Sequence, residues 1–415
     1  MYDDGFAIYD FLMTDNCLFQ LSRLMINNMI SESAHKFLFL LVMAGIYIHI
    51  PFCKQACNYC NFHFSTQTKN VSQMVDAIIR EMELRKGYLA EPVTTIYFGG
   101  GTPSILTEND LGNILAHVDK YFSVGTQTEI TLEANPDDIT KEKLLFWTKA
   151  GINRLSIGTQ SFFEADLQWM NRAHNAAQAI KSILNAQDAG FHNLTIDLIY
   201  GTPSLSDKQW KHNLDTAFAL GITHLSCYAL TVEPKTVLAK HISKGKTEDI
   251  DPEKQSHHFE LLMQWIQDAG WEHYEISNFA KPGFRSQHNS NYWKGASYLG
   301  LGPSAHSYNG ISRQWNVANN NLYLQSIKNE NVPFEIETLS PAQQLNEYLM
   351  TALRTSEGIS LSIVQQKWGE QKKTQLIKES ERWLQSGKMI FENNFLVLTN
   401  TGKLFADGIA ADLFV

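Results

Sequence analysis

Three cysteines near the beginning of the chain have a spacing that suits metal ligation. They are Cys53, Cys57 and Cys60, arranged as C-x3-C-x2-C in the segment His49-Ile-Pro-Phe-Cys-Lys-Gln-Ala-Cys-Asn-Tyr-Cys60. Thiolates are soft ligands that suit an iron–sulfur cluster or zinc. A closed electron-transfer cluster takes four cysteines. Three ligands on a 4Fe–4S cubane would leave one iron open to bind a further molecule and to pass an electron to it.

Two other interpretations of these thiols remain open at this point. A zinc ion could be held with His63 as the fourth ligand, in the pattern C-x3-C-x2-C-x2-H. Four ligands so close in sequence would strain a tetrahedral structural site, which usually joins two separated pairs of ligands. The cysteines could also be buried thiols without a metal, but three aligned thiols in a polar loop fit that role poorly. The spacing therefore favours the cluster.

The composition limits the classes of protein to which the chain can belong. Its 415 residues are 44% hydrophobic and 19% charged, which is ordinary for a globular protein. Five cysteines are too few for a disulfide framework, so we expect a reducing, cytoplasmic compartment. The formal net charge of −9 argues against non-specific binding to nucleic acid. No apolar run reaches the roughly 18 residues that indicate a membrane span.

Residues 1–42 need a separate interpretation. They begin with the acidic Met1-Tyr-Asp-Asp4 and end in the short apolar run Phe37-Leu-Phe-Leu-Leu-Val42. A signal peptide would need a basic start and a small-residue cleavage site, and this segment has neither in a convincing form. We expect an upstream extension here, with Met43 as the true start of the protein, and we assign no role to Cys17.

From residue 44 onward, short β-rich runs alternate with longer helix-like segments. The expected strands are residues 46–50, 94–98, 129–134, 154–158, 194–200 and 224–230. The expected helices are residues 71–86, 108–121, 141–150, 176–189 and 207–220. The residues that suit helix starts or exits are Thr107, Ser206, Gly87, Gly151, Gly190 and Gly221. Six such units indicate an α/β fold with a parallel sheet, closed as a partial (β/α)6 barrel.

Residues that could do chemistry gather where these expected strands end. The cysteines follow the first strand and glycines follow the second. Glu133 ends the third strand, Gln160 follows the fourth, and Asp197 lies within the fifth. In β/α barrels the chemistry gathers at the C-terminal rim of the strands. We therefore expect one functional site at this rim.

The alternation of strands and helices stops at about residue 320. Residues 341–354 and 361–386 are expected helices, followed by a hairpin over 388–398 around Asn393-Asn394. These elements predict a compact helical domain that resembles a winged helix. The expected organisation is a core barrel over residues 43–285, a linking segment over 286–330, and the C-terminal helical domain over 331–415.

The cysteine segment resembles that of the radical S-adenosylmethionine (SAM) superfamily, with an aromatic residue, Tyr59, before the last cysteine. The surrounding Tyr47-Ile-His-Ile-Pro-Phe-Cys53 is similar to the coproporphyrinogen-dehydrogenase-like branch of that superfamily, and the resemblance extends over residues 44–415. It implies that SAM is the molecule that binds the open iron.

The resemblance also implies which residues bind SAM. They are Tyr47, Gly100, Gly101, Thr102, Glu133, Gln160, Arg172, Asp197 and Ala229. Glycines let a backbone approach a ligand closely, although alone they indicate only a tight turn. Glu133 would accept a hydrogen bond from a ribose hydroxyl, and its alternative is a surface or capping acid. The alternative for Arg172 and Asp197 is an ordinary buried ion pair.

Packing is the alternative role for several of these side chains. Tyr47 and Ala229 match the family pattern but would also suit simple packing in the barrel. Cys227, within an expected strand, is expected to pack as a small hydrophobic residue.

Two functions of different classes fit this branch. The first is an oxygen-independent coproporphyrinogen III dehydrogenase of porphyrin biosynthesis, whose pattern has a further cysteine two residues after the third. Phe62 occupies that position here, which argues against this activity. The second is a heme chaperone, which passes heme to an acceptor protein. An electron donor for the cluster is an implied partner of either.

The segment Gln287-His-Asn-Ser-Asn-Tyr-Trp293 contains H-N-x-x-Y-W, which resembles the heme-binding motif of the chaperone members. His288 is a competent axial ligand for heme iron. Tyr292 and Trp293 could cover the porphyrin face. By itself, a histidine beside aromatic residues is more often plain loop packing. His306 is left open between a structural and a ligating role, and the structural role is the expectation.

Overall fold

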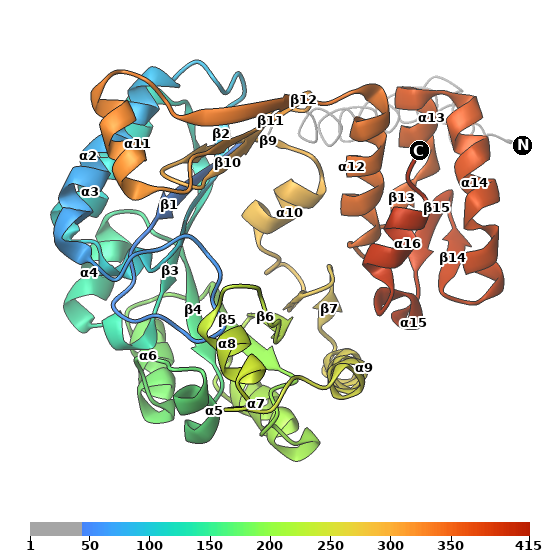
Figure 1. Ribbon diagram of the computed structural model, residues 1–415, viewed down its shortest axis with the longest axis horizontal. Helices are drawn as coiled ribbons and strands as arrows, with labels where there is room; N and C mark the ends of the chain where they lie inside the picture. The colour runs from blue at the N-terminus through green and yellow to red at the C-terminus, as the bar shows by residue number, and fades with distance from the viewer. Residues whose placement is uncertain (1–43) are drawn as a thin grey trace, which may run out of the picture. The chain divides into compact units, whose positions relative to one another are not determined.

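A computed structural model describes residues 44–415 of the chain, and the expectations for residues 1–42, Cys17 and Met43 lie outside this range. The described chain is built around a 12-stranded sheet with the order β12-β11-β10-β9-β1-β2-β3-β4-β5-β6-β8-β7 (Figure 1). Its central six strands are parallel neighbours. They are β1 (Ala44–Ile50), β2 (Val93–Gly100), β3 (Val124–Ala134), β4 (Arg154–Gln160), β5 (Leu194–Tyr200) and β6 (His224–Ala229). The expected partial (β/α)6 barrel is confirmed.

Helices connect these strands and lie along one face of the sheet (Figure 1). They are α2 (Val71–Leu84), α3 (Glu108–Tyr121), α4 (Lys141–Lys149), α5 (Glu164–Trp169), α6 (Ala176–Asp188) and α7 (Asp207–Ala219). The expected N-caps are confirmed, because the side chains of Thr107 and Ser206 accept hydrogen bonds from Asp110 N and Gln209 N. The expected exits at Gly151, Gly190 and Gly221 have positive φ, and the same expectation for Gly87 is wrong.

The sheet continues on both sides of the six parallel strands. Next to β6 lie the antiparallel strands β8 (Asn278–Ala280) and β7 (Glu272–His273), reached through helices α8 (Val237–Ser243) and α9 (Pro252–Asp268). Next to β1 lie β9 (Ser297–Leu301), which is parallel to it, and then β10 (His306–Tyr308), β11 (Ser312–Asn316) and β12 (Phe334–Thr338). Residues 286–330, expected as a linking segment, therefore also build part of this sheet, and they include α10 (Gln287–Trp293) and α11 (Asn320–Lys328).

The C-terminal residues form a separate helical layer with a small sheet. The elements are α12 (Pro341–Leu353), β13 (Ile359–Ser360), α13 (Leu361–Trp368), α14 (Glu370–Gln385), β14 (Met389–Glu392), β15 (Phe395–Leu398), α15 (Asn400–Lys403) and α16 (Ala406–Asp412). The expected single helix over 361–386 is broken at Gly369, whose φ is +90°. The expected hairpin is present, and both Asn393 and Asn394 have positive φ, as a two-residue hairpin turn requires.

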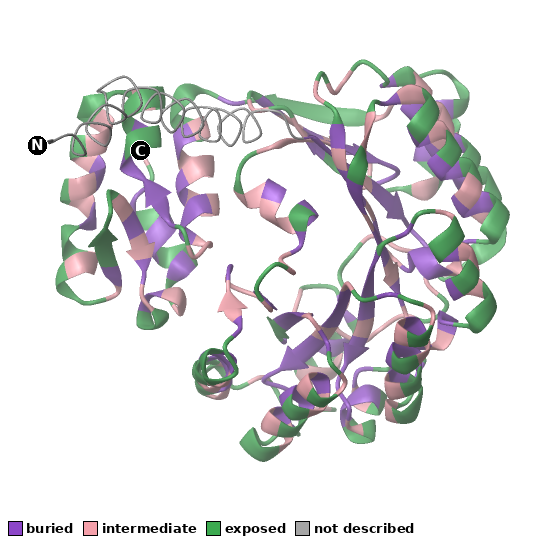
Figure 2. Ribbon diagram, turned by 180° about the vertical axis from the view of Figure 1, so that it is seen from behind, coloured by how far each residue is buried: buried purple, intermediate pink, exposed green. Residues whose placement is uncertain are grey.

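Two hydrophobic cores hold these parts together. The larger core fills the space between the sheet and its helices, and the smaller core lies within residues 345–413. Figure 2 shows the strands mostly buried, while the helices are exposed along their outer faces. The partly buried Ile276 packs against both cores. Within residues 44–415, no helix combines the length and the apolar character needed to cross a membrane.

Candidate functional site

The cysteine loop begins where β1 ends, and backbone hydrogen bonds hold its two ends. Cys53 N donates to Ser65 O over 3.0 Å, and Ser65 N donates to Pro51 O over 2.9 Å. Further along, Asn58 N donates to Met170 O over 3.1 Å. The loop is thereby attached both to its own return segment and to the chain that follows α5. Its three thiols are held at the C-terminal rim of the strands, where the strand ends predicted a site.

All three cysteines are free and partly exposed. Burial raises the pKa of Cys53 to about 11 and also raises the pKa of Cys60. A bound metal deprotonates a coordinating thiol outright, so cluster assembly would override this preference. Among residues 44–415, no three His, Cys, Asp or Glu groups are arranged to hold a metal ion. Each cysteine of a cubane binds a separate iron, so the three thiols fit that group by residue type and by the cavity that they line together.

His63 does not lie with the thiols. Its Nε2 is hydrogen-bonded to Asn320 Oδ1 at 2.7 Å, and its side chain lines a different cavity from the one that the cysteines line. The fourth ligand that the zinc alternative requires is therefore turned away from the cysteine loop.

The glycines after β2 fix the cysteine loop from the other side. Gly101 N donates to Ile50 O over 2.9 Å, and Thr102 N donates to Phe52 O over 2.7 Å. A Cβ on Gly101 would lie 2.6 Å from Phe52 O, and one on Gly100, whose φ is +103°, would lie 2.5 Å from the His49 ring. Gly101 is needed because two backbones meet closely there, and Gly100 because its φ is positive and the His49 ring lies against it.

A cavity of about 440 Å3 opens beside this loop. Its lining includes the three cysteines and eight of the nine residues expected to bind SAM. The eight are Gly100, Gly101, Thr102, Glu133, Gln160, Arg172, Asp197 and Ala229. Tyr47 lies elsewhere: it lines a second cavity, and its hydroxyl is hydrogen-bonded to His49 Nδ1 at 3.2 Å.

Arg172 connects the cysteine loop to the ends of β3 and β4. Its Nη1 donates to Cys57 Sγ over 3.1 Å, and its Nη2 donates to Asn135 Oδ1 over 2.7 Å and to Gly158 O over 2.9 Å. Arg172 therefore does not form the ion pair with Asp197 that its alternative role requires. The Arg172 Nε is buried without a hydrogen-bond partner among the described residues. An unpaired guanidinium N–H in a cavity is a fitting donor for a carboxylate.

Two half-buried carboxyl groups of the same cavity lining, Glu133 and Asp197, have no directly paired cation among the described residues. Burial raises the pKa of Glu133 to about 7 and that of Asp197 to about 6. Glu133 Oε1 accepts a hydrogen bond from Tyr97 OH at 2.8 Å, and Asp197 Oδ1 accepts one from Ser156 Oγ at 3.4 Å. Shifts of this kind gather at functional sites, because a ligand can supply the donors that a buried acid lacks.

The cavity also contains residues that the sequence analysis did not select. They are Asn135, Ser156, Tyr228, Thr231 and Glu233, among others. Asn135 lies two residues after the selected Glu133, and Ser156 lies in the expected strand that precedes the selected Gln160. The position of these strand ends was therefore the signal that could have found them. Gln160 has an unusual backbone for a non-glycine residue, with φ of +66°. Such strain is concentrated at ligand sites.

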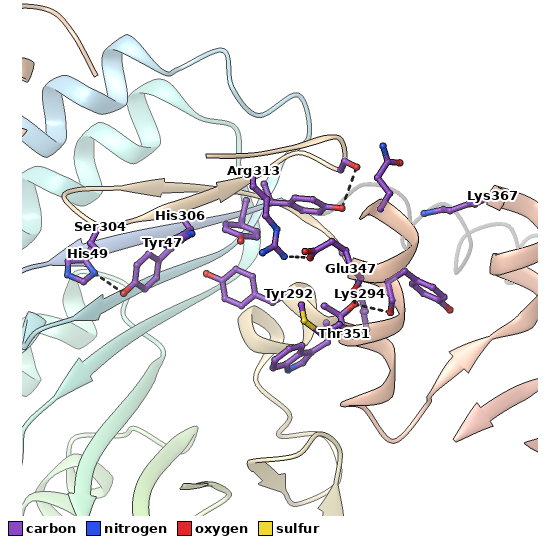
Figure 3. Close-up of a pocket in the computed structure, with 18 of the residues that line it drawn as sticks. Tyr47, His49, Tyr292, Lys294, Ser304, His306, Arg313, Glu347, Thr351 and Lys367 are labelled. Atoms are coloured by element: carbon purple, nitrogen blue, oxygen red, sulfur yellow. Dashed lines mark hydrogen bonds and ion pairs between the residues drawn. The ribbon is translucent and has the colours of Figure 1, made fainter. Parts of the chain in front are cut away.

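The second cavity has a volume of about 890 Å3 (Figure 3). Helix α10 and the strands β1, β10 and β11 border it on one side, and α12 and α13 border it on the other. Its aromatic lining residues are Tyr47, Phe62, Tyr292, Trp293, Tyr298, Tyr308, Tyr348 and Trp368. Lys294, Arg313 and Lys367 add positive charge, and Arg313 is ion-paired with Glu347 across the cavity wall.

The comparisons with known proteins agree with this architecture. The family model of the radical SAM superfamily matches residues 47–217, and that of the HemN C-terminal domain matches residues 339–405. A protein of Bacillus subtilis named heme chaperone HemW is 33% identical over 371 residues, which are 88% of this chain and 98% of the relative. A HemW of Mycobacterium tuberculosis is 34% identical over 375 residues, with 89% and 94% covered.

The chain belongs to the HemW family of radical SAM proteins. Membership implies a 4Fe–4S cluster and SAM. The solved structure of Escherichia coli coproporphyrinogen III oxidase (HemN) has the same fold, with a TM-score of 0.78 at 21% identity and 90% of both chains covered. That likeness extends the fold assignment to the C-terminal helical layer.

His288 of this HemW-family chain is buried beneath the second cavity rather than in its lining. Its Nδ1 is hydrogen-bonded to Thr95 Oγ1 at 2.8 Å and its Nε2 to Tyr292 OH at 2.8 Å. The ring stacks on Tyr97 with centroids 5.0 Å apart. Burial lowers the pKa of His288 to about 3, so the ring is neutral and both of its nitrogens are engaged. Its motif neighbours Tyr292 and Trp293 do line the cavity.

The two cavities of this HemW-family chain share a wall. Asn61 and Phe62, directly after Cys60, line both. Phe62 is 67% exposed, so it is not held in the hydrophobic core. The position at which the dehydrogenase pattern has its further cysteine therefore lies between the cysteine site and the aromatic cavity.

Proposed function

We propose that this chain is a heme chaperone that binds heme in the second cavity and passes it to an acceptor protein, with a SAM-ligated 4Fe–4S cluster at Cys53, Cys57 and Cys60. The observation that supports this most is the aromatic and cationic lining of a cavity of about 890 Å3, directly beside the cysteine site. The names of the similar HemW proteins support the same conclusion.

The chemistry of the second cavity suits a planar, dianionic ligand. Its volume is within the roughly 300–1,000 Å3 of ordinary ligand sites. Aromatic faces pack against an extended π system. Lys294 and Lys367 are exposed at the cavity, where they could pair with the propionate groups of heme. Trp293 Nε1 is buried without a hydrogen-bond partner among the described residues, and it could donate to a propionate as well.

The first cavity suits the cluster and SAM by its donor set. A bound, reduced cluster would supply an electron to SAM, and an electron donor protein would then return the cluster to its reduced state. Arg172 Nε is free to donate to the SAM carboxylate, and Glu133 can accept from the ribose hydroxyls. The same proposal places the chaperone in the cytoplasm, where its thiols stay reduced.

The shared wall offers a physical route for coupling between the two sites. Asn61 and Phe62 follow Cys60 directly, so cluster assembly or SAM binding that moves Cys60 also moves the wall of the heme cavity. We infer that SAM or an electron at the cluster gates the release of heme. The coupling needs a difference in heme affinity between the two cluster states.

The test is anaerobic reconstitution followed by iron and sulfide analysis, heme titration, and transfer to an apo-cytochrome. The Cys53→Ala/Cys57→Ala/Cys60→Ala variant should lose the cluster and SAM binding, and should no longer change its heme affinity when SAM is added. The matched control is Cys227→Ala, which removes a buried thiol of β6 that lines neither cavity. Robust coproporphyrinogen III decarboxylation without heme uptake would overturn the proposal in favour of the dehydrogenase.

A further inference from the structure

We propose that His306, and not His288, supplies the axial nitrogen to heme iron in the second cavity, and that His288 is a structural residue of α10. This inference rests on the proposed heme-binding function and identifies the ligand at that site. An imidazole ligates iron through a ring nitrogen with a free lone pair that faces the metal. The histidines around the cavity can be ranked by that requirement.

His288 fails the requirement on both nitrogens. Thr95 and Tyr292 occupy Nδ1 and Nε2, each at 2.8 Å, and the residue is 2% exposed. Its backbone is fixed as well, because His288 N donates to Glu129 Oε1 over 3.0 Å. Exposing this ring to a porphyrin would break both side-chain hydrogen bonds and the stack on Tyr97. Each broken bond would leave a buried polar group without a partner, which is unfavourable.

Three other histidines line the cavity, and they differ in how their nitrogens are used. His49 is buried, and its two nitrogens are hydrogen-bonded to Tyr47 OH and His63 O. His63 is hydrogen-bonded to Asn320 through Nε2. His306 is exposed in the cavity, and its ring has no hydrogen-bond partner among residues 44–415. Of the three, His306 therefore has both nitrogens available to a ligand.

The strand under His306 holds it in place. His306 begins β10 and is paired with Trp315 of β11, whose indole lies 6.3 Å from the imidazole centroid. Below it, the buried Ser307 accepts a hydrogen bond from Gly300 N at 2.9 Å. A Cβ on Gly300 would lie 2.0 Å from His306 O, so the two backbones are in direct contact. A ligand on a strand this closely packed is preorganised, which favours binding.

The surroundings of His306 also suit the porphyrin that its nitrogen would hold. Tyr47 lies beside it in Figure 3, and Arg313 of the neighbouring strand faces the same cavity. The exposed Lys294 and Lys367 lie on the α10 and α13 sides. An iron ligand on β10, with Lys367 on the α13 side and Lys294 and Arg313 nearer to it, would orient both the metal and the propionates.

The experiment is an anaerobic titration of the full-length protein with ferric heme, followed by absorption and electron paramagnetic resonance. His306→Ala should lose the histidine-ligated spectrum of the wild type and bind heme at least tenfold more weakly. His306→Gly should regain the wild-type spectrum when imidazole is added. His288→Gln should keep that spectrum while its thermal midpoint falls. His117→Ala, at a half-buried position of α3 that lines neither cavity, should behave as the wild type.

The outcomes separate the inference from the proposed function. If the wild type binds heme saturably and His306→Ala keeps both its spectrum and its affinity, the ligand assignment is wrong and the chaperone function stands. The same holds if folded His288→Gln loses the histidine signature while His306→Ala retains it. If the wild type takes up no heme, the proposed function and the inference both fall.

Discussion

Arg172 lies against Cys57, with Nη1 3.1 Å from Sγ, and the same guanidinium donates through Nη2 to Asn135 Oδ1 and to Gly158 O. One planar side chain therefore sets the position of the cysteine loop relative to the ends of two strands. A lysine could carry the charge to this place but could not make three bonds in fixed directions.

Arg172→Lys tests this arrangement. We expect reconstitution of the cluster in this variant to be slower and SAM affinity to fall by about tenfold or more, since a charged hydrogen bond contributes about 1.5–3 kcal/mol. Iron content and a SAM titration measure the two effects. Lys149→Arg, at the end of α4, is a charge-conserving control. If Arg172→Lys bound SAM as tightly as the wild type, the three hydrogen bonds of the planar guanidinium would not be needed for SAM binding.

Phe62→Ala tests the shared wall. Phe62 is 67% exposed, so we expect the free energy of unfolding to change by no more than about 0.5 kcal/mol. The heme affinity measured with SAM should approach the affinity measured without it, because the side chain common to both cavities is gone. Leu145→Ala removes an exposed hydrophobic residue of α4 as the control. Persistence of the full SAM effect in Phe62→Ala would argue against coupling through this wall.

Glu81→Ala should destabilise the strands that carry His306. Glu81 is fully buried on α2, where it pairs with Arg85 at 3.2 Å and accepts from Tyr323 OH at 2.6 Å and from Gly302 N at 2.8 Å. Removing it leaves the buried Arg85 without its carboxylate partner, so we expect the free energy of unfolding in urea to fall by about 3–5 kcal/mol. Glu83→Ala, on the exposed side of the same helix, should cost less than about 1 kcal/mol. Equal losses in the two variants would contradict the prediction.

Acid should destabilise the protein partly through His288. Burial lowers its pKa in the folded state from 6.5 to about 3, so the unfolded chain binds the extra proton first as the pH falls. The contribution of neutral, buried His288 to the free energy of unfolding is therefore complete above pH 6.5. Below pH 6.5 this contribution declines by about 1.4 kcal/mol per pH unit. His288→Gln should therefore show a shallower loss of stability between pH 6.5 and pH 5 than the wild type, whatever its absolute stability. Equal slopes in His288→Gln and the wild type over this pH range would contradict the prediction.

The elements of the barrel could be predicted from the sequence because their signals are local. Alternating apolar runs, capping hydroxyls at Thr107 and Ser206, and glycines at helix exits act within a few residues of the feature that they set. The expectation of one helix over 361–386 missed the break at Gly369, whose backbone, with φ of +90°, ends one helix and begins the next. The same local reasoning did not find β9 to β12, which extend the sheet beyond β1 and begin with β9, a strand that pairs with a segment far away in the sequence.

The sequence by itself determined the cysteine spacing, the order of the strands and the set of polar residues at the strand ends, because parallel strands bring their C-terminal ends to one rim. Tertiary structure decided which side chains share a cavity. It placed Tyr47 with the second cavity, Phe62 between the two cavities, His288 beneath the aromatic residues and His306 among them. Those positions depend on packing between segments far apart in the chain, such as Thr95 against His288, and no local pattern carries that information.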